Sequence, residues 1–465
     1  MIRAWLAPAM ALLAAGCAAS TAYRPPTTPV APAWRAAPEA GAITIGPWWR
    51  AFGDPVLDRL IATALTENLD IEQALARVDQ SRAAAAAAGA ALLPSGTVDG
   101  QAARVRQSIE TGLGRVSQYV PDFPRTVNQY QLTTGASWEL DLAGGLRRGR
   151  EAAGAEAQAA EAMGAQMRVT VAAEVADAYV RLRVLQQRRA IARGQRDSAQ
   201  RILSLTEQRH RLGEAAARAV EQARANAAGA EADLLPIGAG IEAQLNRLAV
   251  LAGRAPQADR MGLDAEAAIP SAPLPGAGSP GDLLRRRPDL VAAERRLAAS
   301  HARVGVALAE YYPRLSLSGL LGFQAQTAGR LLTGDANVIQ GAVGLRWRLF
   351  DFKRLDAERD AAEGREREAL AAYRQAVLRA AEEVENGYAT LGARRTEVAV
   401  RTRETDAAGK ARAMTDSAWN VGEISLFELI DAERTLLAAR DRMALAQGEA
   451  ALAAIACYRA LGGQE

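Results

Sequence analysis

The chain has 465 residues, of which 49% are hydrophobic but only 5% are aromatic, and alanine supplies much of the apolar total. This composition favours long helices packed closely side by side over a thick globular core. The 56 basic and 53 acidic residues nearly balance, with a formal net charge of +3, so the composition gives no support to nucleic-acid binding.

The N-terminus has the pattern of a secretory signal. A positive charge precedes a short apolar run, residues 4–15, which is too short to span a bilayer as a mature helix. The run ends in small residues and Cys17, a pattern that resembles a bacterial lipoprotein signal, in which the cysteine is lipidated after residues 1–16 are removed. Because Ala18 follows the cysteine, analogy with such lipoproteins predicts sorting to the outer membrane. The alternative is a plain secretory signal cut near Ala15, which leaves Cys17 unmodified.

A proline-rich tether, residues 17–47, follows the signal. Its central sequence, "AYRPPTTPVAPAWRAAP", cannot form a helix and need not be ordered. We therefore expect the first folded element after residue 47.

An internal repeat organises the rest of the chain. "AAEVADAYVRL" (172–182) aligns with "AEEVENGYATL" (381–391) at an offset of 209 residues. We interpret 48–260 and 282–465 as two structural repeats produced by duplication, joined by an equatorial linker at 261–281, because the period is far longer than that of a solenoid. The same offset relates Gly135 to Gly344, Trp138 to Trp347, Gly213 to Gly422 and Glu214 to Glu423.

Each repeat contains segments in which polar and apolar residues alternate. We expect one β-hairpin near 95–141, clearest at 131–140, and a second near 313–350, built from 314–324 and 338–349. Their lengths are those of tilted strands that cross a membrane. A half-buried strand in a soluble sheet would show the same alternation, but sorting to the outer membrane favours a transmembrane barrel.

Two hairpins supply only four strands for each chain. In lipid, an open sheet of four strands would leave unpaired backbone groups along both edges, so the chain must assemble with copies of itself. Four strands from each of three chains would make a twelve-stranded barrel. We take Trp138 and Trp347 as its aromatic anchors.

After each hairpin, a proline-free helical pattern runs through 150–212 and again through 353–420. At about 1.5 Å per residue, each helix would be roughly 95–105 Å long. A turn containing glycine, "RLGE" or "NVGE", ends each long helix, after which a shorter helix returns. The shorter helices are expected at 214–252, 423–460, 54–93 and 281–312.

At this stage the sequence resembles the outer-membrane efflux proteins of the TolC type, and more closely their lipidated NodT-like branch. The resemblance implies a homotrimer, mainly α with a small β part, in which a twelve-stranded outer-membrane β-barrel continues into an α-barrel of long antiparallel helices in the periplasm. It also implies an exit duct of a tripartite efflux system, with a periplasmic adaptor protein and an inner-membrane transporter as partners. The segments that carry it are "WELDLAGGLRRGREAA" (138–153), "LLRRRPDLVAAERRLAAS" (283–300), "YYPRLSLSG" (311–319), "WRLFDFKRLDAERDAAE" (347–363) and "NVGEISLFELIDAERTLLAARD" (420–441).

In that family, acidic residues just after the turn of the second repeat line the periplasmic constriction. Matching "FELIDA" to this motif places them at Glu428 and Asp431. The corresponding positions of the first repeat, Ala219 and Gln222, are uncharged, so each chain would contribute to the ring once. The alternative is that both acids merely favour the N-terminal end of a helix dipole. The tip turns expected to contact the adaptor contain Gly213, Glu214, Gly422 and Glu423.

The sequence offers little for catalysis. Only His210 and His301 are present, and no phosphate-binding loop is found, so we expect no catalytic, cofactor-binding or metal site and no enzymatic activity. The covalent lipid on Cys17 is the only attached group we expect. Cys457 lies in an apolar helical pattern and should be a small buried residue.

Two alternatives remain at this level. "RRRPD" (285–289) could bind anions, or it could be a helix start with solvated arginines. The whole chain could instead be a coiled-coil periplasmic lipoprotein, a scaffold or adaptor without a pore. That reading leaves the alternating segments, present at matching places in both repeats, without an explanation.

Overall fold

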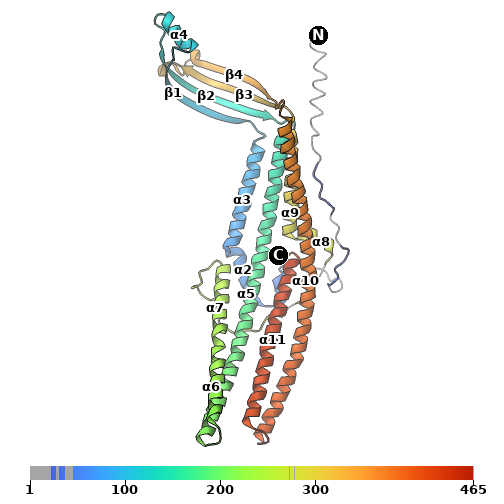
Figure 1. The fold of residues 1–465 in the computed structure, drawn as a ribbon. Coiled ribbons are helices and arrows are strands. Elements are labelled where there is room, and N and C mark those ends of the chain that lie inside the picture. Colours follow the sequence, from blue (N-terminus) through green and yellow to red (C-terminus); the bar gives the residue numbers. More distant parts are fainter. Residues whose placement is uncertain (1–21, 28–30, 37–45, 272, 277, 464–465) are drawn as a thin grey trace. The chain divides into compact units, whose positions relative to one another are not determined.

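The computed structural model describes residues 22–27, 31–36, 46–271, 273–276 and 278–463 (Figure 1). The described chain is mainly helical with one small sheet, as predicted. The predicted signal peptide and its lipidation site, Cys17, lie outside the described residues.

The chain is divided into two compact units. Each takes segments from both predicted repeats, and the helices α3, α5, α9 and α10 contribute residues to both units. The described residues of the first unit fall within the ranges Met1–Pro26, Asp79–Ala159 and Ala293–Ala372, and those of the second within Thr27–Val78, Ala160–Ala292 and Tyr373–Glu465.

The first unit contains an antiparallel sheet in the order β1-β2-β3-β4, with β1 and β4 at its edges. Its strands are β1 (Ser95–Arg106), β2 (Thr126–Leu140), β3 (Arg314–Ala325) and β4 (Asn337–Arg346). The four predicted strands are confirmed, but β4 ends before the predicted residue 349, because its partner strand β3 begins at Arg314, which lies opposite Arg346, and is preceded by Pro313. The loops between strands hold α4 (Gly112–Tyr119), η4 (Ala328–Arg330) and η5 (Gly334–Ala336).

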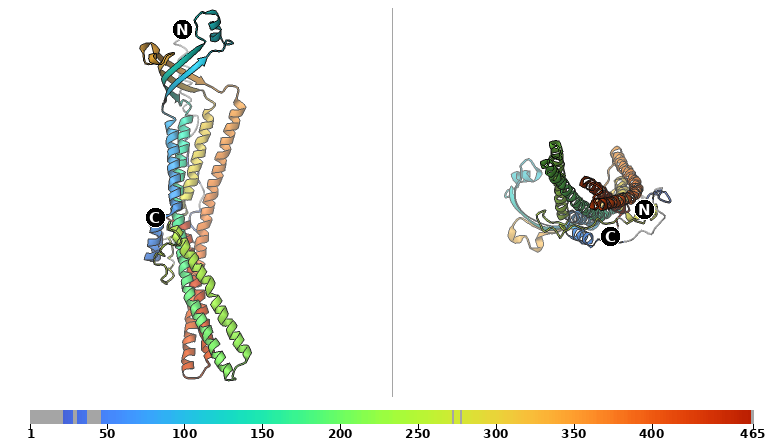
Figure 2. Two further views of the ribbon diagram at one scale, coloured as in Figure 1. Left: turned by 90° about the vertical axis from the view of Figure 1, so that its left-hand side faces the viewer. Right: turned by 90° about the horizontal axis from the view of Figure 1, so that it is seen from below.

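The two long helices are also confirmed. They are α5 (Gly145–Arg211), of 67 residues, and α10 (Phe352–Asn420), of 69 residues. Figures 1 and 2 show α6 (Ala217–Ala232) beside the C-terminal part of α5, and α11 (Leu426–Ala460) beside that of α10. Within the described residues, no helix combines the length and the apolar character needed to cross a membrane. An ion pair between Arg224 and Glu207 joins α6 to α5, and one between Arg442 and Glu404 joins α11 to α10.

Three of the shorter helices were predicted as continuous, and this was wrong. The structure divides 54–93 into α2 (Pro55–Glu67) and α3 (Leu69–Ala90), 214–252 into α6 and α7 (Leu234–Leu251), and 281–312 into α8 (Pro280–Arg286) and α9 (Pro288–Ala309).

Each break has a local physical cause. Asn68 is extended and buried; its amide donates to the carbonyl of Leu251 at 2.9 Å, and its side-chain oxygen accepts the amides two and three residues later, which caps α3. Pro236 has no N–H to donate to the carbonyl four residues earlier, so the hydrogen-bond ladder from α6 cannot continue into α7. Arg287 precedes Pro288 and is extended for that reason.

Small side chains bring the helices of the second unit close together. Ala176, Ala380 and Ala454 are fully buried, which supports the expectation from composition. Cys457 is buried, as predicted, and a Cβ added to Gly387 of α10 would lie 3.4 Å from the Cα of this cysteine in α11.

A buried arginine connects α5 to the linker in the second unit. Arg183 is only 2% exposed, and its guanidinium donates to Gln186 Oε1 at 2.7 Å and to the carbonyl of Ala265 at 2.6 Å. Gln186 in turn donates to the carbonyl of Leu263 at 2.7 Å. The linker therefore follows a defined path, because two of its backbone carbonyls have partners on α5.

Tyr179 completes this cluster. Its ring lies 4.8 Å below the guanidinium of Arg183, and its hydroxyl donates to Asp54 at 2.6 Å. Burial, and next the hydrogen bond to Asp54, raise the pKa of Tyr179 to about 12, so the hydroxyl keeps its proton at neutral pH.

We predict that Arg183→Met lowers the free energy of unfolding of the detergent-solubilised protein by about 2–3 kcal/mol, because Gln186 and a linker carbonyl lose a buried charged donor. Arg181→Met is the matched control. Arg181 lies on the same helix in an exposed ion pair with Asp177, so its loss should cost no more than about 0.5 kcal/mol. Denaturant unfolding of both variants measures the difference, and equal effects would contradict the assignment.

Candidate functional site

One face of the sheet is apolar and exposed. Residues opposite one another in an antiparallel ladder point to the same face, so the register gathers apolar side chains from all four strands. On the edge strand β4, Ile339 and Val343 are 79% and 70% exposed. An exposed face with this many apolar side chains is suited to apolar surroundings. It contains Val98, Leu132, Trp138, Leu140, Leu315, Leu317, Leu321, Phe323, Ile339, Val343 and Leu345.

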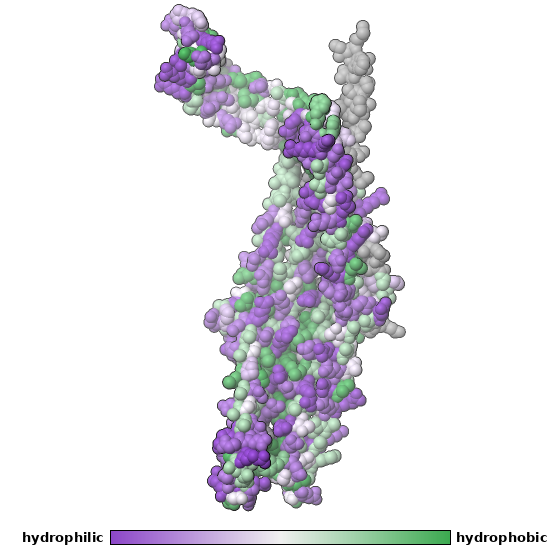
Figure 3. All heavy atoms as spheres, in the orientation of Figure 1, coloured by the Kyte–Doolittle hydropathy of each residue, from purple (hydrophilic) through white to green (hydrophobic). Residues whose placement is uncertain are grey.

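The opposite face of the sheet is mainly polar. Gln131 lies opposite Gln101 on one side and Gln324 on the other, and Ser137 lies opposite Ser318. The predicted alternation is therefore present in the sheet itself, with water suited to one face and hydrocarbon to the other. In Figure 3, polar residues are denser on the helices than on the visible face of the strands.

The two edges of the sheet are open. β1 pairs only with β2 and β4 pairs only with β3 among the described strands. The outer backbone groups of both edge strands are therefore available to further strands.

Both predicted anchor residues hold a junction between helix and strand. The indole N–H of Trp138 donates to the carbonyl of Leu92 at 2.9 Å, and that of Trp347 donates to the carbonyl of Tyr311 at 3.0 Å. Each carbonyl stands two residues before a proline that precedes a strand. The rings remain 38% and 51% exposed. A tryptophan whose indole N–H is hydrogen-bonded while its ring stays exposed suits the interface between membrane and water.

The two predicted turns have the same backbone conformation. Gly213 and Gly422 have φ values of +77° and +80°, the left-handed region that glycine adopts without strain. In each turn the glycine N–H donates three residues back and the N–H of the next residue, Glu214 or Glu423, donates five residues back. This is the Schellman ending of a helix, and it closes α5 and α10 alike.

The two predicted acidic residues have different surroundings. Glu428 belongs to a capping box: its carboxylate accepts the N–H of Ser425 at 2.8 Å, and the Ser425 hydroxyl accepts the N–H of Glu428. Asp431 is exposed, and its carboxylate has no hydrogen bond or ion pair within the part of the chain that the structure describes. The helix-start alternative therefore accounts for Glu428 and leaves Asp431 unexplained.

The first repeat lacks this arrangement. Ala216 stands at the start of α6 without a side-chain cap, and Ala219 replaces the glutamate. The spacing of Ser425 and Glu428 is itself the sequence signal of a capping box, and this signal identifies the role of Glu428.

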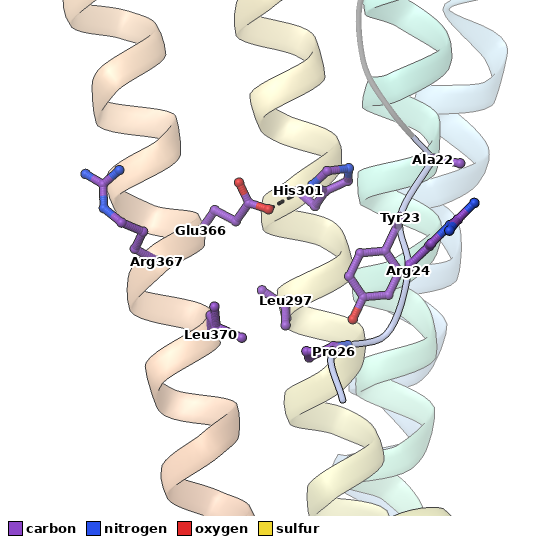
Figure 4. A pocket seen from close by; sticks show the side chains of 9 residues that line it. All are labelled: Ala22, Tyr23, Arg24, Pro26, Leu297, His301, Glu366, Arg367 and Leu370. Atoms are coloured by element: carbon purple, nitrogen blue, oxygen red, sulfur yellow. Dashed lines mark hydrogen bonds and ion pairs between the residues drawn. The ribbon is translucent and has the colours of Figure 1, made fainter. Parts of the chain in front are cut away.

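The described parts of the tether are not helical, as expected, and they are docked on helices. In the first unit, Tyr23 packs against alanines of α5 and α9, and its ring centroid lies 5.8 Å from that of His301, which bonds to Glu366 at 2.8 Å (Figure 4). In the second unit, the carboxylate of Glu385 accepts the backbone N–H groups of Arg35 and Ala36 at 2.8 and 2.9 Å. No sequence pattern indicated these contacts.

The "RRRPD" segment also differs from expectation. Arg287 is not solvated: it is buried, and it pairs with Asp289 and with Glu383, each at 2.7 Å. Its charge is thus already balanced within the protein, which argues against an anion site at this residue.

Comparisons with known proteins agree with this geometry. The family model described as "Outer membrane efflux protein" matches residues 60–254 and 279–463. The pyoverdine export outer membrane protein OpmQ of Pseudomonas aeruginosa is 32% identical over 434 residues, which cover 92% of this chain and 90% of that protein. Nodulation protein T of Rhizobium leguminosarum bv. trifolii is 27% identical over 456 residues, which cover 95% of this chain and 93% of that protein. Among solved structures, the outer-membrane channel OprN has a TM-score of 0.83 and 34% identity, covering 96% of this chain and 98% of that one.

We predict that Trp347→Phe lowers the free energy of unfolding by about 1–2 kcal/mol, because the carbonyl of Tyr311 loses its donor while the aromatic area is largely kept. Trp419→Phe is the control, since the structure gives the Trp419 indole no hydrogen bond within the described residues and the ring is partly exposed. Thermal unfolding in detergent measures both. An equal loss in the two variants would show that the hydrogen bond contributes little.

Proposed function

The chain belongs to the outer membrane efflux protein family, and on this premise we propose that it is the exit duct of a tripartite efflux system. As a member of this family it is an efflux channel of the outer membrane and not an enzyme. The observation that carries the proposal is the four-stranded sheet, with its exposed apolar face, its polar face and its two open edges. We propose that three chains pair these edges into one twelve-stranded barrel, which leaves no backbone group unpaired in lipid.

We further propose that the long helices of the three chains form a continuous α-barrel in the periplasm. The turns at Gly213–Glu214 and Gly422–Glu423 would present the adaptor contact, and the adaptor would connect the duct to an inner-membrane transporter. The matching Schellman turns give the two helix pairs, α5 with α6 and α10 with α11, the same backbone conformation at the tip, which supports this role. Energy for transport would come from the transporter, and the duct would conduct passively.

Lipidation of Cys17 is part of the proposal. The acyl chains would hold the N-terminus at the inner surface of the outer membrane, and no other cofactor is needed. The docked tether residues Tyr23 and Arg35–Ala36 support a fixed path for the chain that follows the lipid.

Asp431 and Glu428 form the proposed periplasmic gate. Because three chains would each supply one copy, the acids would form a ring near the tip, a usual means of selecting ions at a constriction. Asp431 would carry most of the selectivity, since its carboxylate is exposed and unengaged in the described chain, whereas the carboxylate of Glu428 is held by Ser425.

A non-pore scaffold or adaptor lipoprotein is the alternative. Such a protein would use the helices and the lipid but would have no use for an exposed apolar sheet face beside a polar one. The sheet therefore favours the duct.

The membrane-facing assignment is tested by a pair of substitutions on one strand. Val343 and Gln340 lie on opposite faces of β4, and we predict that Val343→Arg destabilises the inserted barrel by about 2–4 kcal/mol near the bilayer centre, whereas Gln340→Arg has little effect. The readout is the amount of heat-modifiable oligomer in outer-membrane fractions. Normal levels of the Val343→Arg oligomer would contradict a lipid-facing position.

The gate is tested by single-channel recording in planar bilayers. We predict discrete conductance for the native protein and a fall of roughly twofold or more in the cation-to-anion permeability ratio for Asp431→Asn. Glu428→Gln should change the ratio less, because glutamine preserves the capping box. Unchanged selectivity in Asp431→Asn would remove this residue from the constriction, and the absence of any channel would remove the duct itself.

A further inference from the structure

The junction between β4 and α10 contains a residue in an unusual conformation. Phe350 has φ of +63°, in the left-handed region, where a bulky side chain is a genuine outlier. Asp122 and Met261 are the other residues besides glycine with positive φ in the described chain, and aspartate adopts this region far more readily than phenylalanine does.

The corresponding junction in the first half of the chain has its left-handed residue at a glycine, but at a different position. Between β2 and α5 this residue is Gly144, with φ of +82°, directly before the helix begins, whereas the residue 209 positions before Phe350 is Asp141, whose φ is not positive. The second junction thus places its left-handed bend at a phenylalanine, and the first places it at a residue that adopts this region without strain. Strain that glycine would relieve indicates a use for the ring itself.

No packing within this chain explains the ring. Phe350 is 95% exposed, so its ring contacts almost nothing in the protein as described. The backbone that presents it is nevertheless fixed on both sides: Trp347 donates to the carbonyl of Tyr311, and Arg348 pairs with Asp351 and Glu358 at 2.7 and 2.8 Å. The ring is held outward on a rigid support.

The neighbours of Phe350 indicate what it meets. Val343, Leu345, Trp347 and Leu349 are exposed apolar residues that alternate along the chain; the first two lie on β4, and the last two lie in the segment that leads from β4 to Phe350. Exposed Phe352 extends the apolar surface.

Immediately after Phe352, the basic residues Lys353 and Arg354 are exposed. An apolar surface with aromatic side chains, followed at once by cations, matches the boundary between acyl chains and phosphate groups in a lipid leaflet.

We propose that Phe350 is a lipid-interface anchor, inserted at the headgroup–acyl boundary of the phospholipid leaflet on the helical side of the sheet, with Lys353 at the level of the phosphates. The left-handed turn allows the ring to leave the alternation of β4 and enter lipid beside Trp347 and Leu349. This inference rests on the proposed membrane-spanning role of the sheet.

The test uses the full-length protein reconstituted in vesicles of phosphatidylethanolamine and phosphatidylglycerol. A nitroxide label is attached at Phe350→Cys, and its collision rates with oxygen, which concentrates in lipid, and with a water-soluble nickel complex are compared. Cys457 is fully buried, and labelling of the native protein measures any background from other thiols. We expect the label to collide more with oxygen than with nickel.

Val343→Cys is the control that separates the two proposals. Lipid contact at 343 but water contact at 350 would overturn the anchor and leave the membrane-spanning sheet standing. Water contact at both positions would overturn the membrane-spanning sheet as well. Protection from both reagents at 350 would overturn the anchor in favour of contact with a second copy of the chain.

Phe350→Gly provides a second measurement. Glycine suits the left-handed turn, so the thermal midpoint in detergent should not fall, whereas insertion into vesicles at limiting lipid should fall about tenfold through the loss of one buried aromatic ring. A lower thermal midpoint with unchanged insertion would assign the ring a structural role and overturn the anchor.

Discussion

Backbone hydrogen bonding in the absence of water is the constraint on which the rest of this molecule depends. In hydrocarbon, every N–H and C=O of a strand needs a partner, and a sheet of four strands satisfies only its interior. The sheet of this chain has an apolar face and two open edges, and in the proposed barrel the strands of other copies would pair with these edges. The self-association that we propose would meet this requirement, and the Ala-rich helices, which pack at short distance, are suited to the wall of the proposed α-barrel.

Much of the fold is readable from the sequence because the relevant signals are local. The alternation in 314–324 predicts β3 to within one residue, and the long stretches without proline predict α5 and α10 nearly to their ends. The breaks in the shorter helices divide into two kinds. Arg287 could have been recognised from the proline that follows it, whereas Asn68 ends a helix partly through a carbonyl that lies 183 residues away in the sequence.

The candidate site shows the same division. The spacing of Ser425 and Glu428 predicts a capping box, so the role of Glu428 was available locally. The partners of Trp347 and Arg183 were not, because the carbonyls they bind belong to distant segments. The two halves share a Schellman turn at the end of each long helix but differ in detail: alanine stands at the start of the returning helix in the first half, and serine in the second. Similar backbone conformations in the two halves therefore carry different side chains.

The contact between Glu385 and the tether has a consequence for how this chain can change over time. The carboxylate binds two main-chain amides and makes no use of the side chains of Arg35 and Ala36. Recognition of this kind tolerates almost any amino acid at the two positions, with proline as the exception, since it has no N–H. Prolines do occur nearby, at positions 32 and 38, but not at the two positions whose N–H groups bind the carboxylate. The segment can drift widely in composition and still be held at the same place.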